Sequence, residues 1–266
     1  MQGSYGWSKS LTNSLLNTAN SDDPRDLEQQ VGPSYFNRPQ RFIINYSWDL
    51  PFGRHDGALG KLTEGWNISG VTTVQDGAPM TLIDSVGGTA YGVSSTTIQG
   101  GLSRAELCPG MTYANVSTSG GITSRLGGPN SANGYFNLAA FCDPPAISPS
   151  GQWFYASSPT ATAQKACMAA DGGVACATGF GNTGPGFISG PGQFNFDVTV
   201  QKVTTITERV RLQIRGEFFN LFNHPQFNQP NFALPTIPNV TSPTFGWITS
   251  TAVNPRVIQL GAKFIF

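Results

Sequence analysis

The sequence predicts an all-β fold, an antiparallel transmembrane β-barrel segment of about six strands in an incomplete barrel with long extracellular loops. Apolar and polar residues alternate with a period of two in several segments. These segments have about the 9–11 residues that a tilted strand needs to cross a bilayer. The connections between them alternate between short and long, which is typical of outer-membrane barrels and not of β-sandwiches.

The N-terminal half contains three such segments. FIINYSWDL (42–50) and WNISGVTTVQ (66–75) alternate, with apolar Ile43 on the otherwise polar face of the first and apolar Val71 on that of the second. A shorter piece has Tyr5 and Trp7 on one face, and we expect it to be the end of a strand that begins before Met1. These segments predict the first three strands.

The alternation is strongest toward the C-terminus, in FNFDVTVQK (194–202), ERVRLQIRGEFF (208–219) and VIQLGAKFIF (257–266). The apolar faces of these three segments contain Phe194, Phe196, Val198, Val200, Val210, Leu212, Ile214, Gly216, Phe218, Ile258, Leu260, Ala262, Phe264 and Phe266. Aromatic residues recur near the ends of the predicted strands, where interfacial girdles of a membrane barrel lie.

The connections divide between two sides. A turn at Val203–Thr207 and the connection 51–65 fall on the side of the C-terminus, whereas the long connections 11–40, 82–192 and 223–255 fall on the other. We expect residues 1–266 to form one C-terminal barrel portion, in which 82–192 is a long extracellular loop that folds into a surface cap or stays partly flexible.

Composition excludes several classes of function. Charged residues make up 11% of the chain and the formal net charge is +0, so there is no electrostatic footprint for nucleic acid. His55 and His224 have no second histidine at ligand spacing, and no nucleophile or phosphate-loop motif occurs. We therefore expect no enzymatic activity, no cofactor and no metal site.

The four cysteines, Cys108, Cys142, Cys167 and Cys176, all lie in the long central loop. An even number in such a segment indicates up to two disulfides in an oxidising compartment. Of the three possible pairings we favour Cys108–Cys142 with Cys167–Cys176; four unpaired thiols remain the alternative.

One group of charged residues lies on the polar faces of the C-terminal strands: Asp197, Arg211, Arg215, Glu217 and Lys263. We expect these side chains to form a mutually compensating wall of the barrel lumen. The alternative is a contact with solute or with another domain inside the barrel.

Two segments resemble a known family. GPGQFNFDVTVQKVTTITERVRLQIRGEFFNLFNHPQF, and above all RGEFFNLFNHPQF (215–227), is similar to the penultimate strand pair of TonB-dependent outer-membrane receptors, in the Oar-like subgroup with a carboxypeptidase-regulatory-like domain. YGWSKSLTNS, NRPQRFIINYSWDLPFG, GWNISGVTTVQDGAPMTL and FGWITSTAVNPRVIQLGAKFIF extend the resemblance, and within the long loop only YFNLAAF (135–141) is familiar.

The resemblance implies a fragment of a receptor in the cell outer membrane of a Gram-negative-type bacterium. Its parent would take up a scarce ligand (a siderophore, glycan or peptide) by TonB-energised transport, through an N-terminal part that is missing here. The expected partners are outer-membrane lipid, the barrel-assembly machinery, the TonB system and an unknown transported ligand. The alternatives are a passive porin or adhesin barrel, or a secreted soluble β-sandwich that binds carbohydrate.

The last residues also resemble a signal. Gln259, Gly261, Phe264 and Phe266 are similar to the polar-x-Gly-x-x-aromatic-x-aromatic pattern by which the insertion machinery recognises the last strand of a barrel. We expect Gly261 to relieve crowding inside the wall. Phe264 and Phe266 are expected to point outward at the membrane interface.

Overall fold

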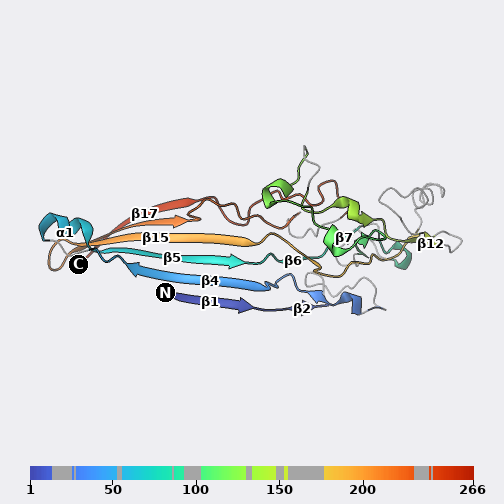
Figure 1. Cartoon of the computed structure of the whole chain (residues 1–266), viewed down its shortest axis with the longest axis horizontal. Helices are drawn as coiled ribbons and strands as arrows, with labels where there is room; N and C mark the ends of the chain where they lie inside the picture. Colours follow the sequence, from blue (N-terminus) through green and yellow to red (C-terminus); the bar gives the residue numbers. More distant parts are fainter. Residues whose placement is uncertain are drawn as a thin grey trace.

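The computed structural model describes residues 1–13, 26, 28–52, 56–85, 87–92, 103–129, 134–147, 153–154, 177–230, 240 and 242–266. Its main element is a six-stranded antiparallel sheet in which the strands are neighbours in chain order (Figure 1). The strands are β1 (Gln2–Trp7), β4 (Gln40–Asp49), β5 (Trp66–Gln75), β15 (Gln193–Thr205), β16 (Arg211–Phe219) and β17 (Val257–Ile265). The sheet does not close, because β1 and β17 form its two edges. The predicted incomplete barrel segment is therefore confirmed.

The register of the sheet places all six predicted apolar stripes on one face. Trp48, Ile68, Val200, Gly216 and Leu260 form one continuous row across five strands. The next row, Ser47, Ser69, Thr199, Glu217 and Gln259, lies on the opposite face. A one-residue slip between any two strands would mix the faces, so the shared alternation specifies the register.

Short and long connections lie at opposite ends of the sheet, as predicted (Figure 1). At the end that we call the turn end lie the C-terminus, the β15–β16 turn and helix α1 (Gly57–Thr63), which belongs to the β4–β5 connection. The ammonium of Lys202 donates to the carbonyls of Leu62 (3.0 Å) and Glu64 (2.7 Å), which satisfies acceptors at the C-terminus of α1.

One predicted boundary was wrong. The expected turn at Val203–Thr207 begins later, because Val203, Thr204 and Thr205 continue β15 opposite β16. The turn is closed by Ile206, whose amide donates to the carbonyl of Val210 over 2.9 Å. Val210 itself lies outside β16.

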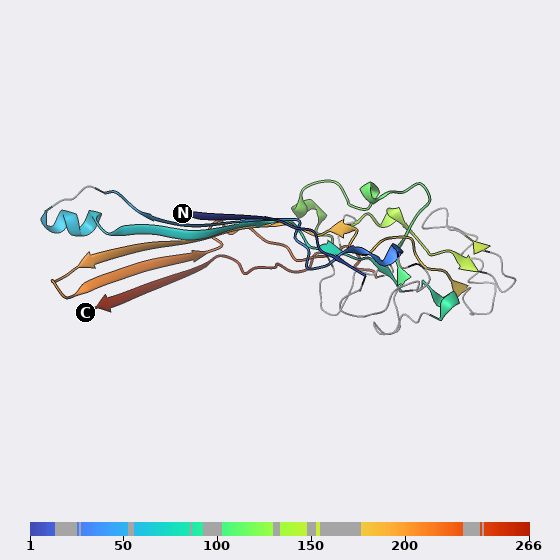
Figure 2. The same ribbon diagram turned by 90° about the horizontal axis from the view of Figure 1, so that it is seen from below.

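At the other end, the loop end, the long connections form a packed unit that we call the cap: the described residues between 78 and 189 together with those between 226 and 252 (Figure 2). Its strands have two residues each and pair as β6 (Pro79–Met80) with β14 (Ile188–Ser189), β7 (Ile83–Asp84) with β8 (Ser103–Arg104), β9 (Glu106–Leu107) with β10 (Phe141–Cys142), and β11 (Ala146–Ile147) with both β12 (Trp153–Phe154) and β13 (Ala177–Thr178). The 3-10 turns are η2 (Thr89–Tyr91), η4 (Tyr113–Asn115), η5 (Ile122–Arg125) and η6 (Leu138–Ala140). Beside the cap lie η1 (Glu28–Gln30) and the pair of β2 (Leu11–Thr12) with β3 (Gly32–Pro33).

The cap has a hydrophobic core of its own. Buried members from the central loop include Leu82, Val116, Phe136 and Phe141, and the later loop adds Phe245 and Ile248. Phe245 stacks on Phe136 with 5.0 Å between ring centroids and meets Phe141 edge-on at 5.5 Å. Backbone hydrogen bonds join the loops as well, from Tyr135 to Gly246 (2.8 Å) and from Ile248 to Leu126 (2.8 Å). Within the described residues, the long loop is therefore a folded cap.

A disulfide joins Cys108 to Cys142, the pairing favoured from the sequence, across the β9–β10 pair with the two Cα atoms 4.9 Å apart. The other favoured partners, Cys167 and Cys176, lie outside the described residues. Among the described helices, none has the length and apolar composition needed to span a bilayer.

Candidate functional site

The polar face of the sheet contains all five residues of the predicted charged cluster. The structure joins only two of them: Nε of Arg215 lies 3.5 Å from Oε1 of Glu217. Asp197 instead accepts hydrogen bonds from the Asn195 side chain (3.0 Å) and from the Asn220 backbone (2.9 Å). Amides contribute as well, since Gln213 donates to Gln201 across β15 and β16 over 2.7 Å. The polar face is thus a hydrogen-bonded wall that contains one ion pair of this cluster.

The terminal residues take the faces that the pattern predicts. Gln259 and Gly261 lie on the polar face and Phe264 on the apolar face, where it is 55% exposed. Crowding at Gly261 is not found, because a Cβ there would lie 3.5 Å from Nε of Arg215, an ordinary contact. The glycine is therefore not required by space within this sheet.

Aromatic rings lie on the apolar face at both ends of the strands. At the turn end are Trp48, Trp66 and Phe264, and at the loop end Phe194 meets Phe196 edge-on (4.7 Å), which in turn meets Phe222 (5.1 Å). Between them the face is apolar and exposed, with Leu260 at 80%. The nine-residue β17 is ~30 Å long at ~3.3 Å per residue and spans ~23 Å at a tilt of ~40°, close to the ~25 Å apolar band of membrane barrels.

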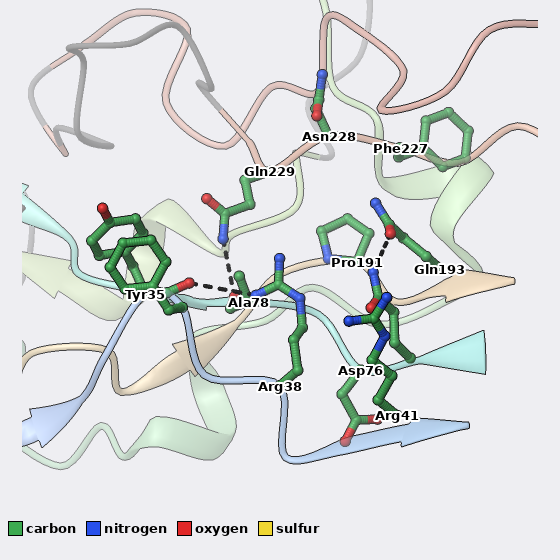
Figure 3. A pocket seen from close by; sticks show the side chains of 12 residues that line it. Tyr35, Arg38, Arg41, Asp76, Ala78, Pro191, Gln193, Phe227, Asn228 and Gln229 are labelled. Atoms are coloured by element: carbon green, nitrogen blue, oxygen red, sulfur yellow. Dashed lines mark hydrogen bonds between the residues drawn. The ribbon is translucent and has the colours of Figure 1, made fainter. Parts of the chain in front are cut away.

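A pocket of about 490 Å³ lies where the loop end of the sheet meets the cap (Figure 3). Its lining includes Arg41, Gln75 and Gln193, which are register neighbours on the polar face of β4, β5 and β15. Further lining residues come from the segments around them and from the later loop: Tyr35, Phe36, Arg38, Asp76, Ala78, Pro191, Phe227, Asn228 and Gln229. Four segments distant in sequence therefore converge on one cavity with a mixed polar and apolar lining.

Hydrogen bonds hold the pocket wall in place. Gln75 and Gln193 bond through their side chains across β5 and β15. The Gln229 amide donates to the carbonyl of Ala78 over 3.1 Å, which ties the later loop to the end of β5. Burial, and then the positive charge of Arg41, lower the pKa of Arg38.

The segment RGEFFNLFNHPQF leads from β16 into the later loop, and its last residue, Phe227, lines the pocket. Asn220 and Asn223 have φ angles of 51° and 50°, which asparagine tolerates better than most residues. The side chain of Asn220 bonds to the backbone of His224 in both directions (3.0 and 3.1 Å). Buried Gln226 likewise donates to and accepts from the backbone of Phe194. This segment thus forms a turn that fixes the start of the later loop beside β15.

The comparison with protein families decides what kind of sheet this is. The model of the outer membrane beta barrel domain family matches residues 1–259, which include the five strands of the sheet from β1 to β16 and the first three residues of β17. This chain belongs to that family. It is an outer-membrane protein, so its apolar face contacts lipid and its polar face lines the barrel interior. The alternative of a secreted soluble β-sandwich is set aside.

No curated protein and no solved structure shows significant similarity to the chain. Sequence patterns did not indicate the pocket. Its residues Arg41, Gln75 and Gln193 nevertheless share one feature: each lies on the polar face at the loop end of its strand.

Proposed function

We propose that this chain is the C-terminal wall and loop region of a TonB-dependent receptor of the Oar-like subgroup, whose parent takes up a scarce ligand by energised transport. The observation that carries the proposal is the cap, in which two long loops share a hydrophobic core at the loop end. A passive pore does not need its loops packed together, whereas capture of a scarce ligand needs a preformed surface. The resemblance of RGEFFNLFNHPQF to this subgroup supports the same conclusion.

In this proposal the loop end faces the exterior. The cap and the pocket capture the ligand there, and the hydrogen-bonded polar face forms part of the passage. The chain acts by binding and transport, without catalysis. Its partners are outer-membrane lipid, the barrel-assembly machinery, which would recognise the pattern from Gln259 to Phe266, and the TonB system through an N-terminal part.

A passive porin or adhesin is the second candidate, because it shares every property of the strands. The two are separated by the reading frame upstream of Met1 and by a binding experiment. The protein encoded by the complete frame is extracted from outer membranes in detergent and passed over the immobilised periplasmic domain of TonB from the same host.

We expect an in-frame plug and TonB box upstream, retention on TonB, and loss of retention when the TonB box is deleted. A frame without a plug, together with a protein that passes the column unretained, would overturn the proposal in favour of a porin or adhesin. Outer-membrane extraction serves as the control, since both candidates require it.

A further inference from the structure

The pocket at the loop end contains two guanidinium groups, those of Arg38 and Arg41, and one carboxylate, that of Asp76. Nη1 of Arg38 donates to the backbone carbonyls of Tyr35 (3.4 Å) and Asn37 (3.1 Å). In the described part of the chain, neither Arg38 nor Arg41 forms an ion pair with a carboxylate. Arg38 is partly buried and Arg41 is exposed. Burial lowers the pKa of Arg38, and repulsion from the like charge of Arg41 lowers this pKa further. A bound anion would relieve the repulsion, and guanidinium is the group best suited to a carboxylate.

Aromatic rings lie at the side of the pocket. The rings of Tyr35 and Phe36 have centroids 3.8 Å apart, and both side chains are exposed. Phe227 lines the pocket from the later loop (Figure 3). Exposed rings beside the charged and amide groups of the cavity offer apolar surfaces on which the C–H faces of a sugar ring can pack.

Amide groups supply the remaining polar surface. Asn228 donates to Ser250 (2.9 Å) and to the carbonyl of Thr251 (3.0 Å), and Gln229 donates to Ala78. Their side-chain oxygens accept no hydrogen bond from the described residues. Each oxygen can therefore accept from a hydroxyl group.

Asp76 narrows the class of ligand. Its carboxylate lines the same pocket as the two arginines. It would repel a ligand that carries several closely spaced charges, such as a phosphate ester. A chain of sugar acids instead presents one carboxylate per ring, separated from the next by several hydroxyls, and Asp76 can accept from such a hydroxyl.

We propose that this pocket binds a carboxylate-bearing glycan, a segment of a uronic-acid oligosaccharide. The ligand carboxylate lies against Arg38 and Arg41, its sugar ring packs on Tyr35 and Phe36, and its hydroxyls bond to the amides and to Asp76. The volume of about 490 Å³ is within the range of small-molecule sites. The inference deepens the proposed function, on which it rests for the transported ligand.

The test is isothermal titration calorimetry on the complete protein, extracted from outer membranes in detergent. The probes are trigalacturonic acid, its trimethyl ester and triglutamic acid. We expect the acid trimer to bind. The ester should bind at least about tenfold more weakly because it loses a charged hydrogen bond, and the peptide at least about tenfold more weakly because it lacks the sugar ring that packs on the aromatic side chains. Binding of the acid trimer should weaken with added salt.

Three variants connect the binding to the pocket. Arg38→Gln and Arg41→Gln should each weaken binding of the acid trimer about tenfold or more. Arg209→Gln, in the exposed β15–β16 turn at the opposite end, should leave the affinity within about twofold. Heat-modifiable gel mobility verifies that each variant is folded.

Equal affinity for the acid and the ester, unchanged affinity in folded Arg38→Gln and Arg41→Gln, or no binding at all would overturn the inference. Tighter binding of triglutamic acid would assign the pocket to acidic peptides instead. Binding in detergent does not require TonB. A protein that binds the trimer but is not retained on TonB therefore refutes the proposed function alone, and a retained protein that ignores the trimer refutes the pocket alone.

Discussion

The substitutions Val200→Arg and Thr199→Arg place the same positive charge on opposite faces of the 13-residue β15. Val200 lies between Ile68 and Gly216 on the lipid-contacting face. Its neighbour Thr199 lies between Ser69 and Glu217 on the polar face. The two substitutions are therefore a matched pair within one strand.

The expected cost of Val200→Arg follows from its surroundings. A lipid-facing arginine near the bilayer midplane destabilises a membrane barrel by about 2–4 kcal/mol, a factor of about 30 to 900 in the unfolding equilibrium. Thr199→Arg meets water and the carboxylate of Glu217, so its effect on the free energy of unfolding should stay within about 0.5 kcal/mol.

The assay is urea unfolding of the complete protein in phospholipid vesicles, measured by tryptophan fluorescence. Linear extrapolation gives the free energy of unfolding of each variant. If Val200→Arg were as stable as the unmodified chain, or if both variants lost the same amount, the assignment of the two faces would be refuted.

Three further predictions concern the cap and the C-terminus. Replacing Cys108 and Cys142 by alanine removes a disulfide with a sequence separation of 34, for which chain entropy gives a loss of about 3–4 kcal/mol in the free energy of unfolding. Trypsin should then cleave the cap loops faster, and unchanged cleavage would contradict a structural role of the disulfide. Burial raises the pKa of Glu106 to about 7, with Asp84 adding to the shift against a hydrogen bond from Asn182, so the folded cap favours the protonated carboxyl. The stability from this group is present below the unfolded pKa of about 4.5 and is lost as the pH rises to about 7. Hydrogen-exchange protection factors in the cap, corrected for the intrinsic pH dependence of exchange, should fall across that window, and Glu106→Gln, which cannot ionise, should abolish the fall. Deleting Phe266 should lower the amount of folded protein in outer membranes severalfold, measured by heat-modifiable mobility after fractionation, and an unchanged amount would argue against recognition of the terminal pattern.

The sheet could be predicted because its information is local. Each strand alternates along its own length, and alternation in neighbouring strands leaves only one register that aligns the faces. Val71, the apolar residue on the otherwise polar face of its strand, lies where the alternation places it, between Asn45 and Asp197 on the polar face. The error at Val203–Thr205 arose because a Val-Thr-Thr stretch has no glycine or proline to mark where a strand ends.

The cap and the pocket could not be predicted in the same way. The cap consists of two-residue strands whose partners are far apart in sequence, such as Met80 and Ile188, so no periodic pattern forms. The pocket depends on the register that brings Arg41, Gln75 and Gln193 into one row. In sequence these residues are single polar side chains at the starts and ends of strands, and only the folded sheet places them together.

The most direct test of the central claim, that one face of the sheet contacts lipid and the other the barrel interior, is spin-label accessibility along β15. Single cysteines are introduced at consecutive positions from 194 to 204, in a chain whose Cys167 and Cys176 are serine, and labelled in vesicles. We expect oxygen, which partitions into lipid, to reach the even-numbered positions, and a polar nickel complex to reach the odd-numbered ones, with a period of two. A flat profile, or polar access to both sets, would contradict the account.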